Sequence, residues 1–327
     1  MSRSIDSIMG QRVVVEVPAT IANLGAGYDC LGLAVDLALH VSILARRDAA
    51  RSVELDVRGE GTGELPADGS NRLVQALGAG LLDAGFEDLD GLGWTVEMIN
   101  TIPLARGLGS SAAATVAGVA AARALLDLPD AGDGADVADA VIRVASKIEG
   151  HPDNVSPAVL GGFTATFATE ADVRAFRFDA PNSLRVVLFV PELRLATSEM
   201  REVLPTEVPR ADAVANLARV AAGVAGIASG DWTVLDFLTE DRLHEPYRAA
   251  VYPQLPALVA AARSAGAIGA CLAGAGSSIA AFAIGADAGQ LDAIGDAMVE
   301  MAAEADLPGW VRILAPSNAG ARVVAVT

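Results

Sequence analysis

A glycine-rich turn that runs directly into a long alanine-rich helix constrains this chain more than any other feature. The turn reads Pro103-Leu-Ala-Arg-Gly-Leu-Gly-Ser-Ser-Ala-Ala113. Gly107 and Gly109 allow the backbone to approach a ligand closely, and the two serines that follow stand where a helix cap is expected. Free amide groups and the positive end of a helix dipole favour a phosphate at such a position. The turn therefore indicates nucleotide chemistry.

Two other interpretations of the turn remain open. It fits the loose pattern G-x-G-x-x-A of dinucleotide-binding proteins, which should directly follow a strand and precede an acidic residue by about 20 positions. Here Pro103 and Arg106 separate the turn from the preceding apolar run, and Asp127 stands at a helix end. The turn could also simply cap a helix. A Walker-type loop requires G-K-[S/T] and is excluded, because Lys147 is the only lysine in the chain.

The net charge limits the partners of this chain. Its 327 residues are 52% hydrophobic and 20% charged, with a formal net charge of −18. That length allows two domains or one large α/β unit. Nucleic acids and anionic membranes need a basic face, so neither is expected as a partner. A nucleotide triphosphate is also repelled by the protein as a whole, and its site must therefore contain local arginines and a divalent metal.

Cysteine use and apolar runs indicate the compartment. Cys30 and Cys271 are too few and too far apart for a disulfide framework or a zinc site. The first ten residues lack the apolar core of a signal peptide. No uncharged apolar run reaches the roughly 18 residues that span a bilayer. We therefore expect a soluble cytoplasmic protein without a membrane partner.

The periodicity of apolar residues predicts an α+β protein with two lobes. In the first half, strands are expected at 12–17, 31–44, 53–57, 94–99, 163–167 and 176–178, and helices at 71–84, 110–126 and 137–148. In the second half, strands are expected at 184–190, 268–272, 279–284 and 311–314, and helices at 212–227, 232–238, 255–264 and 291–303. The last β-turn-β-α-β run suits a split βαβ layer. A boundary near Pro181 divides the chain into domains 1–180 and 181–327.

Two polar clusters stand apart from the periodic core. The first, Pro18-Ala-Thr-Ile-Ala-Asn-Leu-Gly-Ala-Gly-Tyr-Asp29, follows a strand, and it either lines a site or forms a tight turn held by local hydrogen bonds. The second is Glu149-Gly-His-Pro-Asp-Asn154. A carboxylate there could bind Mg2+, which prefers one or two protein oxygens together with phosphate oxygens. The alternative is a turn whose Asp153-Asn154 pair caps the next helix.

Two arginines and a second small-residue turn complete the candidate set. Arg201 lies in Thr197-Ser-Glu-Met-Arg-Glu-Val-Leu-Pro205, and Arg248 ends Glu245-Pro-Tyr-Arg248. Arginine binds carboxylates and phosphates through paired N–H donors, although most surface arginines form no such contact. The turn Gly274-Ala-Gly-Ser-Ser278 either approaches the first loop or only connects two strands.

The chain offers no convincing group for covalent catalysis. Its three histidines, His40, His151 and His244, are scattered, and no G-x-S-x-G elbow is present. Phosphoryl transfer least requires such a group, because it needs a phosphate cradle, a metal, charge neutralisation and a positioned hydroxyl.

In this order, the turn and the clusters resemble the GHMP kinase family, which includes galactokinase and the homoserine, mevalonate and phosphomevalonate kinases. The matching segments span about residues 12–282. The segments that contain Asp29, Glu149, Arg201 and Arg248 resemble the branch that acts on L-homoserine. The resemblance implies ATP-dependent phosphorylation of the side-chain hydroxyl of L-homoserine to O-phospho-L-homoserine, a step of threonine biosynthesis. The alternative is another kinase of the family that acts on a mevalonate-like acid or a sugar.

The resemblance also implies a fold and a set of site residues. The fold is a two-lobed α+β GHMP kinase fold, with a mixed sheet and a phosphate-binding loop–helix in the N-terminal lobe and a split-βαβ, ferredoxin-like C-terminal lobe. ATP is implied to contact Pro103, Leu104, Ala105, Arg106, Gly107, Leu108, Gly109, Ser110, Ser111, Ala112 and Ala113, and Mg2+ to contact Ser111 and Glu149. The implied substrate residues are Asn23, Asp29, His151, Asn154, Arg201 and Arg248, of which the two arginines grip the carboxylate.

The sequence also bears on the general base, on the 274–278 turn and on the oligomeric state. Some relatives use an aspartate–lysine pair, but Lys147 lies beside the metal-site glutamate, so no lysine-assisted base is expected. We expect Asp29, Asn154 and Glu149 to be the catalytic residues, acting through positioning and charge stabilisation. Relatives often have proline where this chain has Ser277. The alanine-rich helix near 212–227 could form a homodimer contact, although core packing explains it equally well.

Overall fold

The first lobe is built on a mixed sheet of seven strands. The structure, a computed structural model, describes residues 5–129, 132, 134–169 and 172–327. Within these residues the strand order is β11-β1-β2-β4-β3, while β5 pairs with the start of β2 and β6 pairs with β5. Strands β3 and β4 are parallel, and the other neighbouring pairs are antiparallel. The strands are β1 (Arg12–Ala22), β2 (Leu31–Arg47), β3 (Val53–Gly59), β4 (Leu92–Asn100), β5 (Phe163–Ala168), β6 (Val173–Phe178) and β11 (Arg322–Val326).

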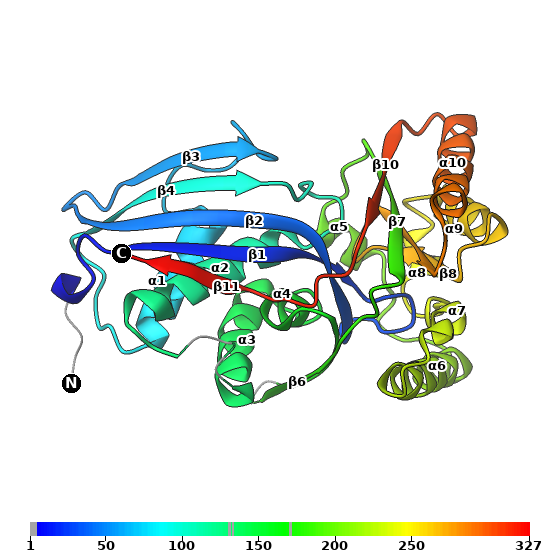
Figure 1. Cartoon of the computed structure of the whole chain (residues 1–327), viewed down its shortest axis with the longest axis horizontal. Helices are drawn as coiled ribbons and strands as arrows, with labels where there is room; N and C mark the ends of the chain where they lie inside the picture. The colour runs from blue at the N-terminus through cyan, green and yellow to red at the C-terminus, as the bar shows by residue number, and fades with distance from the viewer. Residues whose placement is uncertain (1–4, 130–131, 133, 170–171) are drawn as a thin grey trace.

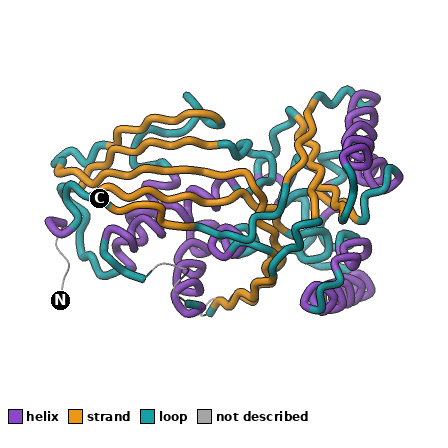
Figure 2. The backbone as a smooth tube through the Cα atoms, in the orientation of Figure 1, coloured by secondary structure: helices purple, strands orange, loops and turns teal. Residues whose placement is uncertain are grey.

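The helices of this lobe lie on one side of the sheet (Figures 1 and 2). They are α1 (Arg72–Asp83), α2 (Ser110–Leu125), α3 (Ala135–Glu149) and α4 (Val155–Leu160), after a short η1 (Ile5–Ser7). Strand β2 shows the pattern that produces this arrangement, because buried Leu39 and Val41 flank exposed His40. Successive side chains of a strand point to opposite faces, so one face of the sheet packs on helices and the other meets solvent.

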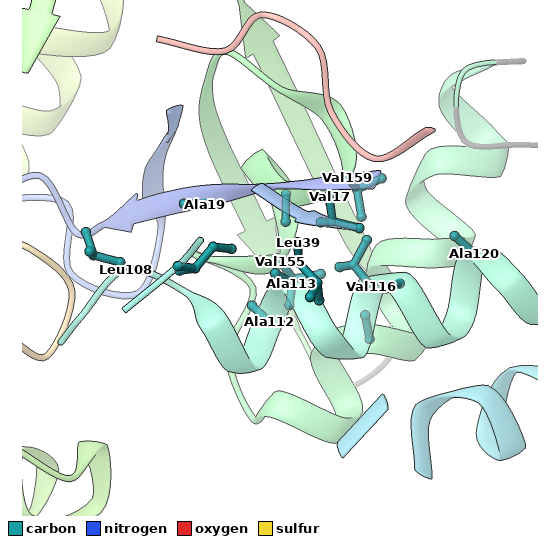
Figure 3. Packing of buried hydrophobic residues seen from close by; sticks show 14 of the residues in the cluster. Val17, Ala19, Leu39, Leu108, Ala112, Ala113, Val116, Ala120, Val155 and Val159 are labelled. Atoms are coloured by element: carbon teal, nitrogen blue, oxygen red, sulfur yellow. The ribbon is translucent and has the colours of Figure 1, made fainter. Parts of the chain in front are cut away.

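Helix α2 is almost entirely buried, and its small side chains explain how closely it packs. Ala112, Ala113 and Val116 share a buried cluster with Val17 of β1 (Figure 3). On the α1 side, a Cβ atom at Gly118 would lie 2.4 Å from the carbonyl oxygen of Leu73. Larger residues would push the layers apart. The alanine-rich sequence therefore fixes the position of the helix start that follows the glycine-rich turn.

The second lobe is a four-stranded antiparallel sheet covered by helices. Its strand order, β10-β7-β9-β8, is that of a split-βαβ, ferredoxin-like layer. The strands are β7 (Leu184–Pro191), β8 (Gly269–Leu272), β9 (Ile279–Ile284) and β10 (Gly309–Leu314). The helices are α5 (Thr197–Glu202), α6 (Arg210–Ala228), η3 (Trp232–Val234), α7 (Leu235–Leu238), α8 (Glu245–Arg248), α9 (Leu255–Ser264) and α10 (Ala288–Glu304). The predicted two-lobed α+β architecture is confirmed.

Strand β1 is longer than the sequence predicted. The expected strand ended before Pro18, but β1 continues to Ala22 with a register shift between Pro18 and Ala19. Proline cannot donate a ladder hydrogen bond, and a bulge at this position lets the strand continue past it. The extension carries Thr20 and the end of β1 up to the glycine-rich turn, where the amide of Thr20 donates to the carbonyl oxygen of Leu108.

The end of the chain departs from the predicted division into 1–180 and 181–327. Strand β11, which the sequence analysis did not predict, leaves the second lobe and pairs with β1 in the first sheet. The amide of Arg12 donates to the carbonyl oxygen of Thr327, and the amide of Thr327 donates to that of Arg12. The boundary near Pro181 stays a prediction, but the final strand belongs to the first sheet (Figure 1).

Candidate active site

One cleft between the two lobes brings together most of the candidate residues. Its volume is about 120 Å3, and it is lined by loops from both lobes. Its lining comprises Asn23, residues 103 and 105–112, Glu149, His151, Asp153, Asn154, Thr197, Arg201, Arg248, Gly274 and Ala275. Lys147 is exposed on α3 and is not part of this lining.

The start of α2 leaves backbone amides free to bind an anion. Gly109 is the N-cap residue, in a left-handed conformation with φ of 69°, and no side chain caps the helix. The first amide of α2 that donates to a backbone carbonyl is that of Ala113, which donates to the carbonyl oxygen of Gly109 at 2.8 Å. The amides of residues 110–112 have no partner among the described residues. The expectation that the two serines cap the helix is wrong, since Gly109 is the N-cap residue.

The two glycines are required by close contacts as well as by their conformation. Gly107 and Gly109 both have positive φ angles, which residues with a Cβ atom rarely adopt. A Cβ atom at Gly107 would lie 2.0 Å from the carbonyl oxygen of Ala273, and one at Gly109 would lie 2.0 Å from Oγ1 of Thr20. The glycine-rich turn is therefore in close contact with β1 on one side and with the 273–278 turn of the second lobe on the other.

The guanidinium of Arg106 faces the second lobe and is occupied by backbone carbonyls. Nε donates to Pro191 at 2.6 Å, Nη2 to Glu192 at 2.9 Å and Nη1 to Leu104 at 3.0 Å. Burial lowers the pKa of this guanidinium, and the nearby Arg194 lowers it further. We conclude that Arg106 supports the turn through its side chain and is not a free cation for phosphate.

Glu149 lies beside the free amides because α3 ends there. Gly150, in a left-handed conformation, terminates the helix, and its amide donates to Ser146 at 2.8 Å. Oε1 of Glu149 accepts a hydrogen bond from Ser111 at 2.9 Å and another from Thr115 at 2.6 Å. The carboxylate is 6% exposed, and Nε of Arg72 lies 3.6 Å from it.

The groups at this corner suit magnesium. Oε2 of Glu149 has no partner among the described residues, and the hydroxyl of Ser111 is a second hard oxygen donor. No cluster of three or more His, Cys, Asp or Glu side chains that could hold a metal occurs among the described residues. Mg2+ is commonly bound by one or two carboxylates together with substrate phosphates, so a glutamate beside free helix amides fits it.

Residues 151–154 form a buried hydrogen-bonded turn on the cleft wall. Oδ1 of Asp153 lies 2.5 Å from Nδ1 of His151 and accepts from the amide of Asn154 at 2.8 Å. Burial lowers the pKa of His151, but the hydrogen bond and the charge of Asp153 outweigh it and raise the pKa overall. Asn154 does not cap α4 with its side chain; its Oδ1 instead accepts from Oγ1 of Thr20 at 2.8 Å.

The loop between β1 and β2 is a tight turn that also lines the cleft. The side chain of Asn23 is used within the protein, since Oδ1 accepts from the amide of Asp29 at 2.9 Å and Nδ2 donates to Gly274 at 3.0 Å. The tight-turn interpretation is therefore confirmed for Asn23. Asp29 does not line the cleft directly; its carboxylate is paired with Arg201 through distances of 2.6 and 3.0 Å.

The two candidate arginines differ in how much of each guanidinium is available. Both terminal nitrogens of Arg201 are engaged, by Asp29 and by the hydroxyl of Tyr28. Arg248 is 1% exposed, and its Nε and Nη1 donate to neighbouring groups, whereas Nη2 has no hydrogen-bond partner among the described residues. Arg248 is thus the better candidate for binding a carboxylate in the cleft.

Ser277 uses its hydroxyl in a way that proline could not. Oγ donates to the carbonyl oxygen of Leu193, next to the segment that accepts from Arg106. The amide of Ser278 donates to the carbonyl oxygen of Arg106 at 3.2 Å. The 273–278 turn does approach the glycine-rich turn, as one of the two interpretations proposed.

Several residues that line or support the cleft were not predicted as site residues, namely Thr20, Arg72, Thr115, Asp153, Thr197 and His244. A signal existed for two of them. Thr115 stands four residues after Ser111, and His244 four residues before Arg248, so each pair shares one face of a helical turn. It was also not expected that α5 and α8, which carry the two arginines, are short helices.

Comparison with known proteins covers both lobes. The sequence-family model for the N-terminal domain of GHMP kinases matches residues 71–162, and the family model for their C-terminal domain matches residues 224–304. A homoserine kinase of Moorella thermoacetica is 38% identical over 312 residues, which are 95% of this chain and 99% of that protein. A homoserine kinase of Thermus thermophilus is 42% identical over 267 residues, which are 82% of this chain and 85% of that protein.

Solved structures resemble this fold along nearly its whole length. A crystal structure of homoserine kinase from Cytophaga hutchinsonii has a TM-score of 0.80 and 29% identity, covering 96% of this chain and 97% of that chain. A mevalonate kinase of L. major in complex with R-mevalonate has a TM-score of 0.67 at 18% identity, covering 98% of this chain and 100% of that chain. The second likeness shows the fold alone.

Proposed function

The chain belongs to the GHMP kinase family, and from this premise we propose that it transfers the terminal phosphoryl group of ATP to the side-chain hydroxyl of L-homoserine. The product is O-phospho-L-homoserine, an intermediate of threonine biosynthesis. The main structural support is a single cleft that presents free helix amides, the carboxylate of Glu149 and the guanidinium of Arg248. Relatives that share more than a third of the sequence over most of its length are homoserine kinases, which supports the choice of substrate.

The polyphosphate of ATP would bind at the start of α2. The amides of residues 110–112 would donate to phosphate oxygens, and the helix dipole adds to the attraction. Magnesium bound with the nucleotide supplies charge neutralisation at the phosphates, with Glu149 and Ser111 as its protein ligands. Because α2 is buried along its length, these donors are fixed before the nucleotide binds.

The acceptor hydroxyl would be positioned rather than strongly activated. Nδ2 of Asn154 has no partner among the described residues, because Thr20 engages only its Oδ1. Nε2 of His151 likewise has no hydrogen-bond partner among the described residues, whereas Nδ1 is held by Asp153. We propose that these two side chains orient the amino-acid alcohol, that Arg248 holds its carboxylate, and that the Asp29–Arg201 pair closes the pocket around it. Phosphoryl transfer gains most of its rate from positioning and charge stabilisation.

ADP formation tests the proposed reaction directly. The purified protein with Mg2+ and ATP should release ADP with L-homoserine, and mass spectrometry should detect O-phospho-L-homoserine. Mevalonate and galactose serve as alternative acceptors, since kinases of the same family act on them. Turnover with either of these, but not with L-homoserine, would overturn the substrate assignment and leave the family intact.

The hydrogen bonds by which Arg106 supports the glycine-rich turn lead to a second prediction. Replacing Arg106 by alanine should raise the KM for ATP about tenfold, because three backbone carbonyls lose their donor and the turn relaxes away from the second lobe. The KM for L-homoserine should change little. Steady-state kinetics with each substrate varied in turn provide the measurement.

A neighbouring arginine provides the matched control for this variant. Arg194 is 52% exposed and, among the described residues, pairs with Glu64 on the surface, so Arg194→Ala should leave both KM values within about twofold of wild type. If Arg106→Ala also bound ATP like the wild type, the supporting role of Arg106 would be wrong.

We further propose that the protein acts in the cytoplasm, without a membrane or nucleic-acid partner. Of the helices in the described ranges, α6 is by length and composition apolar enough to cross a membrane. However, Asn216 and Arg219 on this helix bond to Asp241 and Glu240, so α6 is tied along the side of the second lobe. Its outer face exposes Val214 and Leu217, and a homodimer contact at this face stays a prediction.

A further inference from the structure

A buried histidine that the proposed reaction does not use lies directly behind the substrate pocket. His244 is fully buried, and Nδ1 lies 2.9 Å from Nη1 of Arg248. Nε2 lies 2.9 Å from the carbonyl oxygen of Gly25. The ring packs against that of Tyr28 at a tilt of 35°, with their centroids 5.3 Å apart. The histidine thus connects the arginine on α8 with the loop that contains Asn23 and Asp29.

The partners of His244 determine its tautomer. Arginine has N–H donors and no acceptor, so Nδ1 must accept the hydrogen bond from Arg248. Nε2 must then hold the proton and donate it to Gly25. An imidazolium would present an N–H group to the arginine donor and lose this contact.

The surroundings keep the ring neutral. Burial and, to a smaller extent, the charge of Arg248 lower the pKa of His244 to about 4, against the opposing effect of the Asp241 carboxylate. The nearest oxygen of Asp241 is 3.7 Å from Nε2, and it accepts instead from the amides of His244 and Glu245, each at 2.7 Å. At neutral pH the histidine is therefore available as an acceptor.

The three acceptors around Arg248 leave one terminal nitrogen for a ligand. Nε donates to Met200 at 3.2 Å, and Nη1 donates to Gly274 at 3.0 Å as well as to His244. The carbonyl oxygen of Gly274 also accepts from Asn23. Both carbonyls belong to the backbone, so His244 is the one side chain among these acceptors. Its removal would leave the guanidinium with two backbone acceptors and no side-chain acceptor.

We propose that His244 is a positioning residue that orients Arg248 to bind the carboxylate of the substrate. The proposal rests on the proposed function, in which that carboxylate belongs to L-homoserine. A guanidinium that is already oriented loses little conformational freedom when it binds. His244 therefore contributes to substrate affinity without touching the substrate.

Two substitutions, each with an amide side chain, test the two hydrogen bonds of the ring one at a time. In His244→Asn, an amide oxygen stands near the position of Nδ1 and can still accept from Arg248. In His244→Gln, an amide nitrogen stands near the position of Nε2 and can donate to Gly25, but the acceptor for Arg248 is lost. We expect the KM for L-homoserine to rise about tenfold in His244→Gln and to stay within about threefold in His244→Asn. The KM for ATP should not change in either variant.

An analogue without the carboxylate distinguishes positioning from a structural role. L-homoserine amide lacks the carboxylate, so His244→Gln should not reduce its turnover relative to the wild type by more than about twofold. In the background of Arg248→Ala, His244→Gln should add nothing to the KM for L-homoserine, because the group that it positions is gone. Thermal unfolding confirms that each variant is folded.

Three outcomes would overturn the inference. These are equal KM values in the two histidine variants, equal losses with L-homoserine and its amide, or additive effects of His244→Gln and Arg248→Ala. Failure of the proposed function would look different, since the wild-type protein itself would then not phosphorylate L-homoserine.

Discussion

Replacing Glu149 by alanine should lower kcat for L-homoserine phosphorylation by about a thousandfold or more, which corresponds to about 4 kcal/mol of transition-state stabilisation. The buried carboxylate is the acidic group beside the free amides of α2, and it accepts from Ser111 and Thr115. Its loss would remove the proposed protein carboxylate for magnesium. The measurement is kcat at saturating ATP and L-homoserine over a range of Mg2+ concentrations.

Two further variants separate charge from packing at this position. Glu149→Gln keeps the size of the side chain and an oxygen for the two hydroxyls, but it has no charge, so it should be impaired almost as severely as Glu149→Ala. Lys147→Ala, on the exposed side of the same helix, should retain kcat within about twofold. Substantial activity in Glu149→Gln would contradict a metal-binding role for this carboxylate.

Replacing Arg248 by alanine should raise the KM for L-homoserine about a hundredfold, with a much smaller effect on the KM for ATP. The reason is that Nη2 of this buried guanidinium has no hydrogen-bond partner among the described residues. Nε and Nη1 donate to neighbouring groups and fix the orientation of the guanidinium. Initial rates at varied L-homoserine, together with calorimetric titration of the amino acid, would measure the effect.

The choice of controls matters because Arg248 is buried. Arg248→Lys retains a positive charge but not the fork of donors, so we expect it to recover only part of the affinity. Arg210→Ala, at the exposed start of α6, should behave like the wild type. If Arg248→Ala folded normally and bound L-homoserine unchanged, the carboxylate assignment would be wrong.

The sequence predicted the composition of the site better than the directions of its side chains. Ser111 and Glu149 were expected to lie together, and Oγ of Ser111 is 2.9 Å from Oε1 of Glu149. One residue stands at the start of a helix and the other at the end of a helix, so the backbone largely fixes where each side chain lies. Long side chains were harder to place. Arg106 faces the second lobe, and Arg201 binds Asp29. Several hydrogen-bonding partners compete for an arginine, and only the assembled fold decides among them.

The same limit explains the misassigned elements. Periodicity identified the long strands and helices, since their buried faces repeat along the sequence. It did not identify β11, a five-residue strand whose pairing partner, β1, stands about 300 residues earlier. It also placed the end of β1 at Pro18, because a local rule cannot anticipate the register shift that lets the strand continue.

The path of the last strand has a consequence for how the protein is made. During synthesis, one edge of β1 stays without its neighbour until the residues of β11 have left the ribosome, because β11 supplies that neighbour. An open sheet edge attracts other chains, so the nascent first lobe is exposed to aggregation until β11 has been made. A gene divided at the lobe boundary would make that exposure permanent, and the two lobes are therefore one unit of biosynthesis.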